Sequence, residues 1–381
     1  MSRLLAPSQA WLFGRGVDLA VFAGSALASV GLVLAASALG LVGDTPLWAW
    51  VLLVVCVDVA HVWSTLFRTY FDGEELRRRP GLYLAAPLVA YLLGVLAYLG
   101  SPGTFWRLFA YTALFHFVRQ QYGWVALYGR KARVSDTERR LDGAAIYAAT
   151  LGPVLWWHAN LPRDFWWFVE NDFVSGLPSW VGTGALVLHG LVLVAWAGFQ
   201  GTRLVRGEGL QVGKVLLVLA TWVVWYGGIV LARSDFAFTV MNVLLHGVPY
   251  FALLFRYARG RLAEGGYGGL APLVRAGLPG FLGVLFVLAL GEELLWDWLV
   301  WHERSSLFGE SALVPPADLL ALVVPLLALP QATHYLLDAF IWKPGREPAL
   351  LKRLGWTRGE GEGSPASTAP ISGLAIPGVT D

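Results

Sequence analysis

Five of the seven histidines lie inside long apolar stretches, where an imidazole can bind a metal ion or carry a proton. Ionisable side chains are rare in such stretches because their transfer into hydrocarbon is unfavourable. Imidazole binds iron, copper and zinc, and histidines mixed with carboxylates are typical of non-haem Fe(II) sites that react with oxygen. These residue types therefore indicate a metal site or a proton-handling site within a membrane. The five residues are His61, His116, His189, His246 and His334.

Two carboxylates accompany the histidines at helical spacing. Asp58 precedes His61 by three residues and Asp338 follows His334 by four, so each pair shares one helix face. A carboxylate in lipid needs a partner. We expect both aspartates to bind a metal ion or to orient a ligating imidazole through its second ring nitrogen. The expected metal ligands are four of the histidines: His61, His116, His246 and His334.

A third candidate catalytic residue, beside Asp58 and Asp338, is Arg119, which follows His116 in a polar group of the same stretch. Structural interpretations stay open for several of these residues. The two aspartates could pair with Arg68 or Arg119, and Arg119 could bind a lipid headgroup. For His189, which only apolar residues and glycine surround, an interhelical hydrogen bond is the preferred interpretation.

The composition predicts the elements that must position these residues. Of the 381 residues, 56% are hydrophobic and 14% are charged, whereas a soluble protein carries about 25% charged residues. A membrane span needs about 20 apolar residues. The chain is thus predicted to be all-α, a polytopic membrane helix bundle of about ten transmembrane helices. The predicted spans are 17–41, 47–71, 81–100, 104–128, 143–158, 179–199, 214–232, 236–257, 276–298 and 318–342.

Lysine and arginine gather in alternate connections, such as 77–79 and 130–140, which predicts that both termini are cytoplasmic. The five histidine-bearing spans are then the even-numbered ones, and all run from the outer face to the inner face. Each histidine lies about 8–12 residues before the cytoplasmic end of its span, which is about 12–18 Å along a helix. Because the helices run in the same direction, we expect the imidazoles to share one depth near mid-membrane and to converge on a single metal centre.

The remaining predictions concern the ends of the chain and the outer face. Residues 1–342 form the predicted transmembrane domain, 343–356 a basic interfacial segment and 357–381 a disordered tail. The outer residues are predicted to be solvated or near the surface. They are His158, His302, Glu292, Glu293 and Asp297.

The overall charge and the cysteine content exclude several classes of protein. A net charge of +2 gives no support to nucleic-acid binding. Cys56, the single cysteine, excludes disulfides, thiolate zinc sites and iron–sulfur clusters within one chain. The first apolar run is too long for a cleavable signal peptide, so we expect it to stay as a helix. The expected location is the bacterial inner membrane.

A metal site at mid-membrane is reached from the bilayer, so the expected substrate is an apolar molecule such as an isoprenoid, carotenoid, quinone or acyl chain. The pattern therefore predicts a metal-dependent membrane oxidoreductase or oxygenase, with iron favoured over copper and zinc. The expected partners are membrane lipids and the apolar substrate. Two other classes stay open. One is a haem protein with axial histidines, and the other is a proton-coupled transporter that uses Asp58, Asp338 and Arg119.

Two short stretches resemble a known family. The run from His334 to Asp338 is similar to the His-Gly-x-x-Asp element of the Brp/Blh family, and Phe115-His116-Phe117 resembles its short His-Phe element. That family comprises bacterial membrane oxygenases that cleave β-carotene to retinal with histidine-bound iron. Here Tyr335 stands in place of the glycine, the element lies in the last span, and no His-x-x-x-His pair is present. The resemblance implies a class of metal site, and it does not extend to carotene cleavage.

Overall fold

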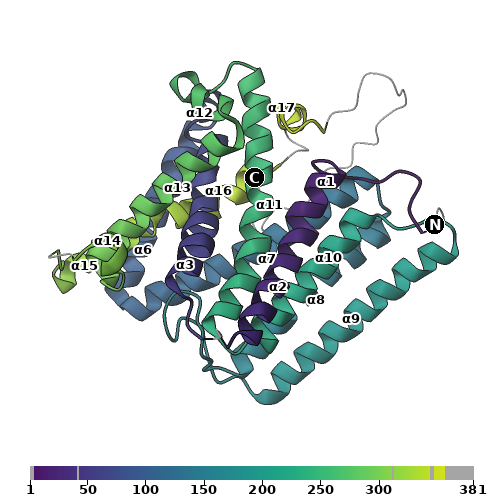
Figure 1. The fold of residues 1–381 in the computed structure, drawn as a ribbon, viewed down its shortest axis with the longest axis horizontal. Coiled ribbons are helices and arrows are strands. Elements are labelled where there is room, and N and C mark those ends of the chain that lie inside the picture. Colours follow the sequence, from purple (N-terminus) through teal and green to yellow (C-terminus); the bar gives the residue numbers. More distant parts are fainter. Residues whose placement is uncertain (1–3, 41–42, 311–312, 344–346, 357–381) are drawn as a thin grey trace. The chain divides into compact units, whose positions relative to one another are not determined.

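The computed structural model describes residues 4–40, 43–310, 313–343 and 347–356, and within these ranges all regular secondary structure is helical (Figure 1). Contacts between residues divide the chain into two compact units. The first unit holds Met1–Asp58 and Gly100–Ala252, and the second holds Val59–Leu99 and Leu253–Asp381. Each unit is therefore built from two separate stretches of the sequence.

The first unit is built around three helices of 24 to 31 residues, two helices of 14 residues, the first part of a further long helix, and a π-helical segment that carries Asp58. Its elements are α1 (Arg15–Asp18), the π-helix η1 (Leu19–Gly24), α2 (Ser25–Ala38), α3 (Leu47–Ala49), the π-helix η2 (Trp50–Val59), α7 (Pro102–Ala132), α8 (Asp136–Ala159), α9 (Ser179–Val205), α10 (Val212–Trp225), the π-helix η4 (Tyr226–Leu231) and the first part of α11 (Asp235–Ala263).

The second unit contains the rest of α11 and several shorter helices. Its other elements are α4 (Ala60–Ser64), the 3-10 helix η3 (Thr65–Arg68), α5 (Gly73–Arg78), α6 (Pro80–Gly100), η5 (Gly268–Leu270), α12 (Ala271–Arg275), α13 (Gly277–Trp296), the π-helix η6 (Asp297–Trp301), α14 (Ser305–Phe308), α15 (Ala317–Leu327), α16 (Leu329–Ile341) and α17 (Pro348–Arg353).

Local sequence signals set the ends of the two most polar long helices, α7 and α8. Ser101 accepts a hydrogen bond from the backbone N–H of Thr104, and Pro102 opens α7 with its φ already fixed for a helix. Ser135 caps α8 in the same way through the N–H of Glu138. Between them, Arg133 adopts a left-handed conformation with φ 54°, which ends α7.

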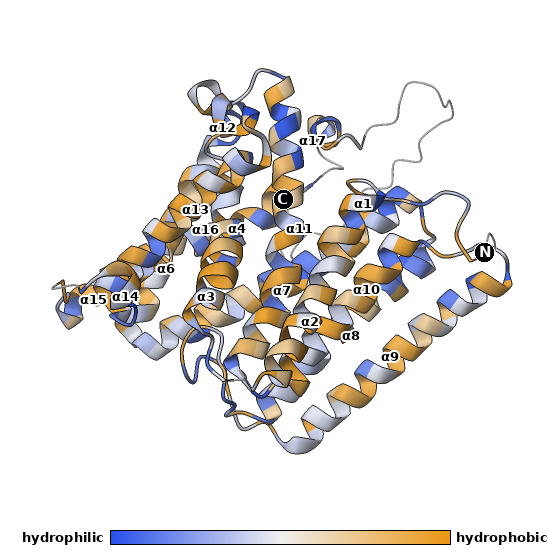
Figure 2. Ribbon diagram, in the orientation of Figure 1, coloured by the Kyte–Doolittle hydropathy of each residue, from blue (hydrophilic) through white to orange (hydrophobic). Residues whose placement is uncertain are grey.

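Seven helical segments of the described residues are long and apolar enough to cross a membrane, and the bent pair α15–α16 makes eight if it is one span. Each of the ten predicted stretches is helical over most of its described residues, but α7 and α8 do not belong to these seven segments. The count of ten therefore stays a prediction. Figure 2 shows hydrophobic residues along most of α9, where Leu188, Leu191 and Val194 are exposed, as lipid-facing side chains are. The seven segments are Arg15–Ala38, Leu47–Arg68, Pro80–Gly100, Ser179–Val205, Val212–Leu231, Asp235–Ala263 and Gly277–Trp301.

Small residues allow helices of the first unit to pack closely. A Cβ atom on Gly152 of α8 would lie 2.7 Å from the Cβ atom of His189 on α9, and one on Gly182 would lie 2.8 Å from the Cβ atom of Ala159. In α2, the Ser29 hydroxyl donates a hydrogen bond to the carbonyl of Val240 on α11. Close approach of small residues and polar bonds between helices are the means by which membrane helices associate.

The predicted interfacial segment contains a short helix, α17, which packs on protein. Leu350 and Leu354 are fully buried, and Arg353 forms ion pairs with Glu74 and Glu264 at 2.9 and 2.8 Å. Binding of this segment to anionic lipid stays a prediction. The predicted disordered tail, 357–381, lies outside the described residues.

Candidate metal centre

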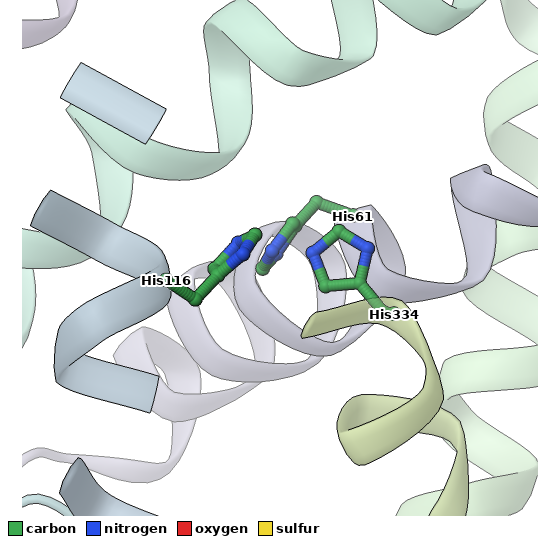
Figure 3. A group of neighbouring side chains, drawn as sticks. All are labelled: His61, His116 and His334. Atoms are coloured by element: carbon green, nitrogen blue, oxygen red, sulfur yellow. The ribbon is translucent and has the colours of Figure 1, made fainter. Parts of the chain in front are cut away.

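The second unit brings two of the predicted ligands together. His61 lies on α4 and His334 on α16, and their ring centroids are 5.1 Å apart with the planes at 81° (Figure 3). A ring nitrogen of each lies within 4.8 Å of the other. Both side chains are buried, with 1% and 2% exposure. Two nitrogens at this separation can bind one ion after small side-chain movements, since each Zn–N or similar bond is about 2.0–2.1 Å long.

A bend in the chain places His334. Helices α15 and α16 meet at an angle of 40°, and Pro330 lies in the first turn of α16, where its missing N–H is tolerated. The ring is then held by Thr65, whose Oγ1 lies 2.7 Å from Nδ1 of His334. Asp338 Oδ1 is 3.8 Å from the same nitrogen and accepts a hydrogen bond from the Trp342 indole. Oxygen partners of this kind at one ring nitrogen direct the other toward a metal.

The first unit holds the second pair. His116 on α7 and His246 on α11 have ring centroids 5.2 Å apart and planes at 85°. Both are buried. The His246 ring stacks on Phe117 with a centroid distance of 3.5 Å, and Gln120 donates a hydrogen bond of 2.7 Å to the His246 carbonyl. Two residues of α7 thus fix the position of His246.

Asp58 belongs to the same unit and lies beside His246. One carboxylate oxygen of Asp58 is within 4.8 Å of a ring nitrogen of His246. Asp58 is near the end of the π-helix η2, and π-helical segments are frequent at functional sites. Gly247 allows this approach, because a Cβ atom there would lie 2.7 Å from the Val57 side chain.

Arg119 has other neighbours within the first unit. Its guanidinium donates a hydrogen bond to the Tyr147 hydroxyl and lies 4.8 Å from the centroid of the Tyr122 ring. Two tyrosines therefore hold this side chain, and its catalytic role stays a prediction. Arg68, which the sequence offered as a partner for the aspartates, pairs instead with Glu75 and Glu347 at 3.0 and 2.8 Å.

The structural interpretation of His189 is confirmed. Trp222 donates its indole N–H to Nε2 of His189 at 3.1 Å, and Nδ1 lies 2.7 Å from the Ala148 carbonyl. Because Nε2 accepts a hydrogen bond, the proton is on Nδ1, which donates to that carbonyl. His189 links α8, α9 and α10, and both of its nitrogens are used.

Three predictions about outer residues are wrong. His158 was expected to be solvated, but it is buried, with 7% exposure, and bonded to the Tyr111 hydroxyl and the Val154 carbonyl. Glu292 was expected near the surface, but only 5% is exposed and it accepts a hydrogen bond of 2.7 Å from Trp63. Asp297 was also expected near the surface, but only 4% is exposed and it accepts hydrogen bonds of 2.9 Å from the backbone N–H groups of Glu303 and Arg304. For His158 and Glu292, the side chain that bonds to the buried polar group is distant in the sequence.

Each unit thus contains two buried imidazoles with an aspartate close by. His116 and His246 lie with Asp58, and His61 and His334 lie with Asp338. This donor set of nitrogen and oxygen suits divalent iron, copper or zinc. The convergence of all four histidines on one ion stays a prediction.

Comparisons with protein-family models, with curated proteins and with solved structures find no match to this chain. The similarity to the Brp/Blh family remains one between the quoted residues, from His334 to Asp338 and from Phe115 to Phe117.

Proposed function

We propose that this chain is an integral membrane protein that binds a transition-metal ion, with iron favoured, and uses it to oxidise or oxygenate an apolar substrate. The metal ligands are His61, His116, His246 and His334. The observation that carries the proposal is the pairing of buried imidazoles, each pair beside a carboxylate. The location proposed with it is the cytoplasmic membrane of a bacterium.

The chain's own residues have defined tasks in this proposal. Each imidazole ligates through a ring nitrogen that carries no proton. Asp58 and Asp338 act as ligands or as acceptors that orient the rings, and Thr65 orients His334. The apolar surroundings keep water from the site. The bound metal supplies the redox chemistry. Arg119 is a further candidate for contact with the substrate.

Metal analysis of the purified protein tests the proposal. We expect iron, copper or zinc at a fixed ratio to protein, and a loss of that metal in His61→Ala/His334→Ala and in His116→Ala/His246→Ala. One ion per chain, lost in both variants, is the expected result. The control is His302→Asn in the exposed outer loop, which should keep the metal. Negligible metal in the wild-type protein would contradict the proposal.

Two further measurements separate the proposal from the other classes. An absorption spectrum with a Soret band would identify haem and oppose a non-haem centre. Ion-dependent uptake into proteoliposomes that persists after all four histidines are replaced by alanine would favour a transporter. We expect no Soret band and no such uptake.

A further inference from the structure

A cavity of about 340 Å³ lies within the second unit and ends at one of the proposed metal ligands. This volume is at the lower end of the roughly 300–1,000 Å³ of pockets that hold small ligands. The wall comes from α4, η3, α6, α15 and α16. Its residues are Val62, Trp63, Thr65, Leu66, Thr69, Tyr70, Pro87, Leu326, Leu329, Pro330, Thr333, His334 and Leu337.

One side of this cavity borders the lipid-facing surface. Leu326 of α15 lines it and is 55% exposed. Pro87 of α6 lines it too, and its neighbours Leu84 and Leu88 on α6 are exposed. Exposed leucines on segments of this apolarity face hydrocarbon. The bend between α15 and α16 falls at this wall, so the packing of the two helices is interrupted there. A molecule dissolved in the bilayer can enter from this side.

The chemistry of the wall restricts the occupant. Among the described residues that line the cavity, none is an acid, a lysine or an arginine, and the imidazole of His334 is the only ionisable group besides the Tyr70 phenol. A charged headgroup or a free phosphate would have no counter-charge there and is unfavourable. The cavity therefore fits an apolar chain.

A single polar atom of the wall indicates how such a chain is oriented. Thr333 is 8% exposed, and within the described residues its buried Oγ1 has no hydrogen-bond partner. The other polar side chains of the wall are engaged. Thr65 bonds to His334, Thr69 to the Thr65 carbonyl, Tyr70 to the Tyr83 carbonyl and Trp63 to Glu292. A buried hydroxyl without a partner is unfavourable, and a ligand oxygen would satisfy it.

We infer that this cavity binds the apolar chain of a membrane-dissolved alcohol or ketone, an acyl or isoprenoid lipid with a neutral oxygen group. Thr333 hydrogen-bonds to that oxygen, and the chain lies against His334. This inference rests on the proposed function, because it makes the cavity the substrate site next to a proposed metal ligand. It adds the substrate class, a neutral lipid with a hydroxyl or carbonyl group, and a specificity residue, Thr333.

Photolabelling tests the inference on the full chain in lipid nanodiscs. The first probe is a long-chain primary alcohol with a diazirine in its chain, and the second is an alkane of the same length with the same diazirine. We expect the alcohol to label residues of the cavity wall, and we expect this labelling to saturate as the alcohol concentration rises. Thr333→Val should weaken alcohol labelling by about fivefold to tenfold, the effect of one lost hydrogen bond, and leave alkane labelling unchanged. Thr333→Ser keeps the hydroxyl and should therefore keep the alcohol labelling of the wild-type protein.

A pair of variants on α15 tests the entrance. Leu326→Trp fills the lipid-facing side of the cavity and should abolish labelling of the wall by both probes. Leu322→Trp, four residues earlier and also exposed, is outside the wall and should have no effect. Equal labelling in wild type and Leu326→Trp, or labelling spread over exposed leucines of all helices, would overturn the inference.

The metal content of the same samples keeps the two proposals apart. Thr333→Val and Leu326→Trp should retain wild-type metal, which also shows that they fold. Metal without saturable labelling refutes the cavity as a lipid site and leaves the metal centre standing. Saturable, Thr333-dependent labelling of a protein without metal supports the lipid site and refutes the proposed oxidoreductase.

Discussion

The ring of His246 lies flat on the ring of Phe117, with centroids 3.5 Å apart and planes at 8°. Phe117 follows His116 directly on α7, so one helix supplies both a proposed ligand and the surface that orients its partner. Stacking and burial together restrict the rotation of the His246 ring before any ion binds. This restriction lowers the entropic cost of metal binding.

Phe117→Leu is therefore expected to lower metal affinity by about tenfold, the lower range for loss of a group that orients a ligand. Affinity is measured by titration of the metal-free protein with Co²⁺ or Zn²⁺ against a competing chelator. Phe115→Leu is the matched control, because Phe115 lies on the same helix but is exposed. Identical affinities in the two variants would show that the stack has no part in binding.

His189→Leu is expected to leave the metal content unchanged and to lower stability. The variant loses the bonds to Trp222 and Ala148, and interhelical bonds in membranes contribute about 0.6 kcal/mol each, so the loss is about 1 kcal/mol. Unfolding in detergent measures it. Trp222→Phe should lose about half as much, and the double variant should be less than additive. A loss of metal in His189→Leu would make this histidine a ligand after all.

We expect the fold to lose stability in acid because of the buried carboxylate of Glu75 on α5. Burial alone would raise its pKa, but the charge of Arg68 and hydrogen bonds from Tyr83 and Arg78 lower the pKa to about 2, from an ordinary value of 4.5. Because the folded-state pKa is the lower one, the carboxylate stabilises the fold above about pH 4.5. This contribution disappears as the pH falls from there toward 2.

The variant Glu75→Gln should lose about 3 kcal/mol at neutral pH, because it breaks a buried ion pair. Denaturation measured from pH 3 to pH 7 should show a constant difference from wild type above about pH 5 that shrinks in acid. The control is Asp136→Asn, whose exposed ion pair with Arg139 should contribute less than about 1 kcal/mol. A difference that grows as the pH falls would contradict the assigned direction of the pKa shift.

Cysteine labelling decides whether α7 and α8 cross the membrane. In a Cys56→Ala background, we expect Asp136→Cys, in the exposed start of α8, to react with an impermeant maleimide in inverted vesicles only. Ser306→Cys, in the opposite set of connections, should react in intact spheroplasts only. If α7 and α8 do not cross, their connection lies on the outer side and both cysteines react there. An even number of spans keeps both termini on one side in either case.

The helices could be predicted from the sequence because the requirement is local. A segment within hydrocarbon must satisfy its own backbone hydrogen bonds over about 20 residues, and this requirement leaves an apolar run of matching length. Each of the ten predicted runs is helical over most of its described residues. The caps are local too, because Ser101 and Ser135 each accept a hydrogen bond from the backbone N–H three residues later. The candidate ligands were likewise recognisable as polar residues in such runs.

The tertiary structure decided which of these polar residues meet. The pairing of His61 with His334 and of His116 with His246 joins residues that are far apart in the chain, so no local signal shows which of these histidines meet. His189, which its apolar neighbours in the sequence already set apart, bonds instead to Trp222 and Ala148. The burial of His158 and Glu292 depends in the same way on Tyr111 and Trp63. The hydropathy of the sequence shows where a side chain lies along its own helix. The choice of neighbouring helix depends on packing between segments, which is a property of the whole fold.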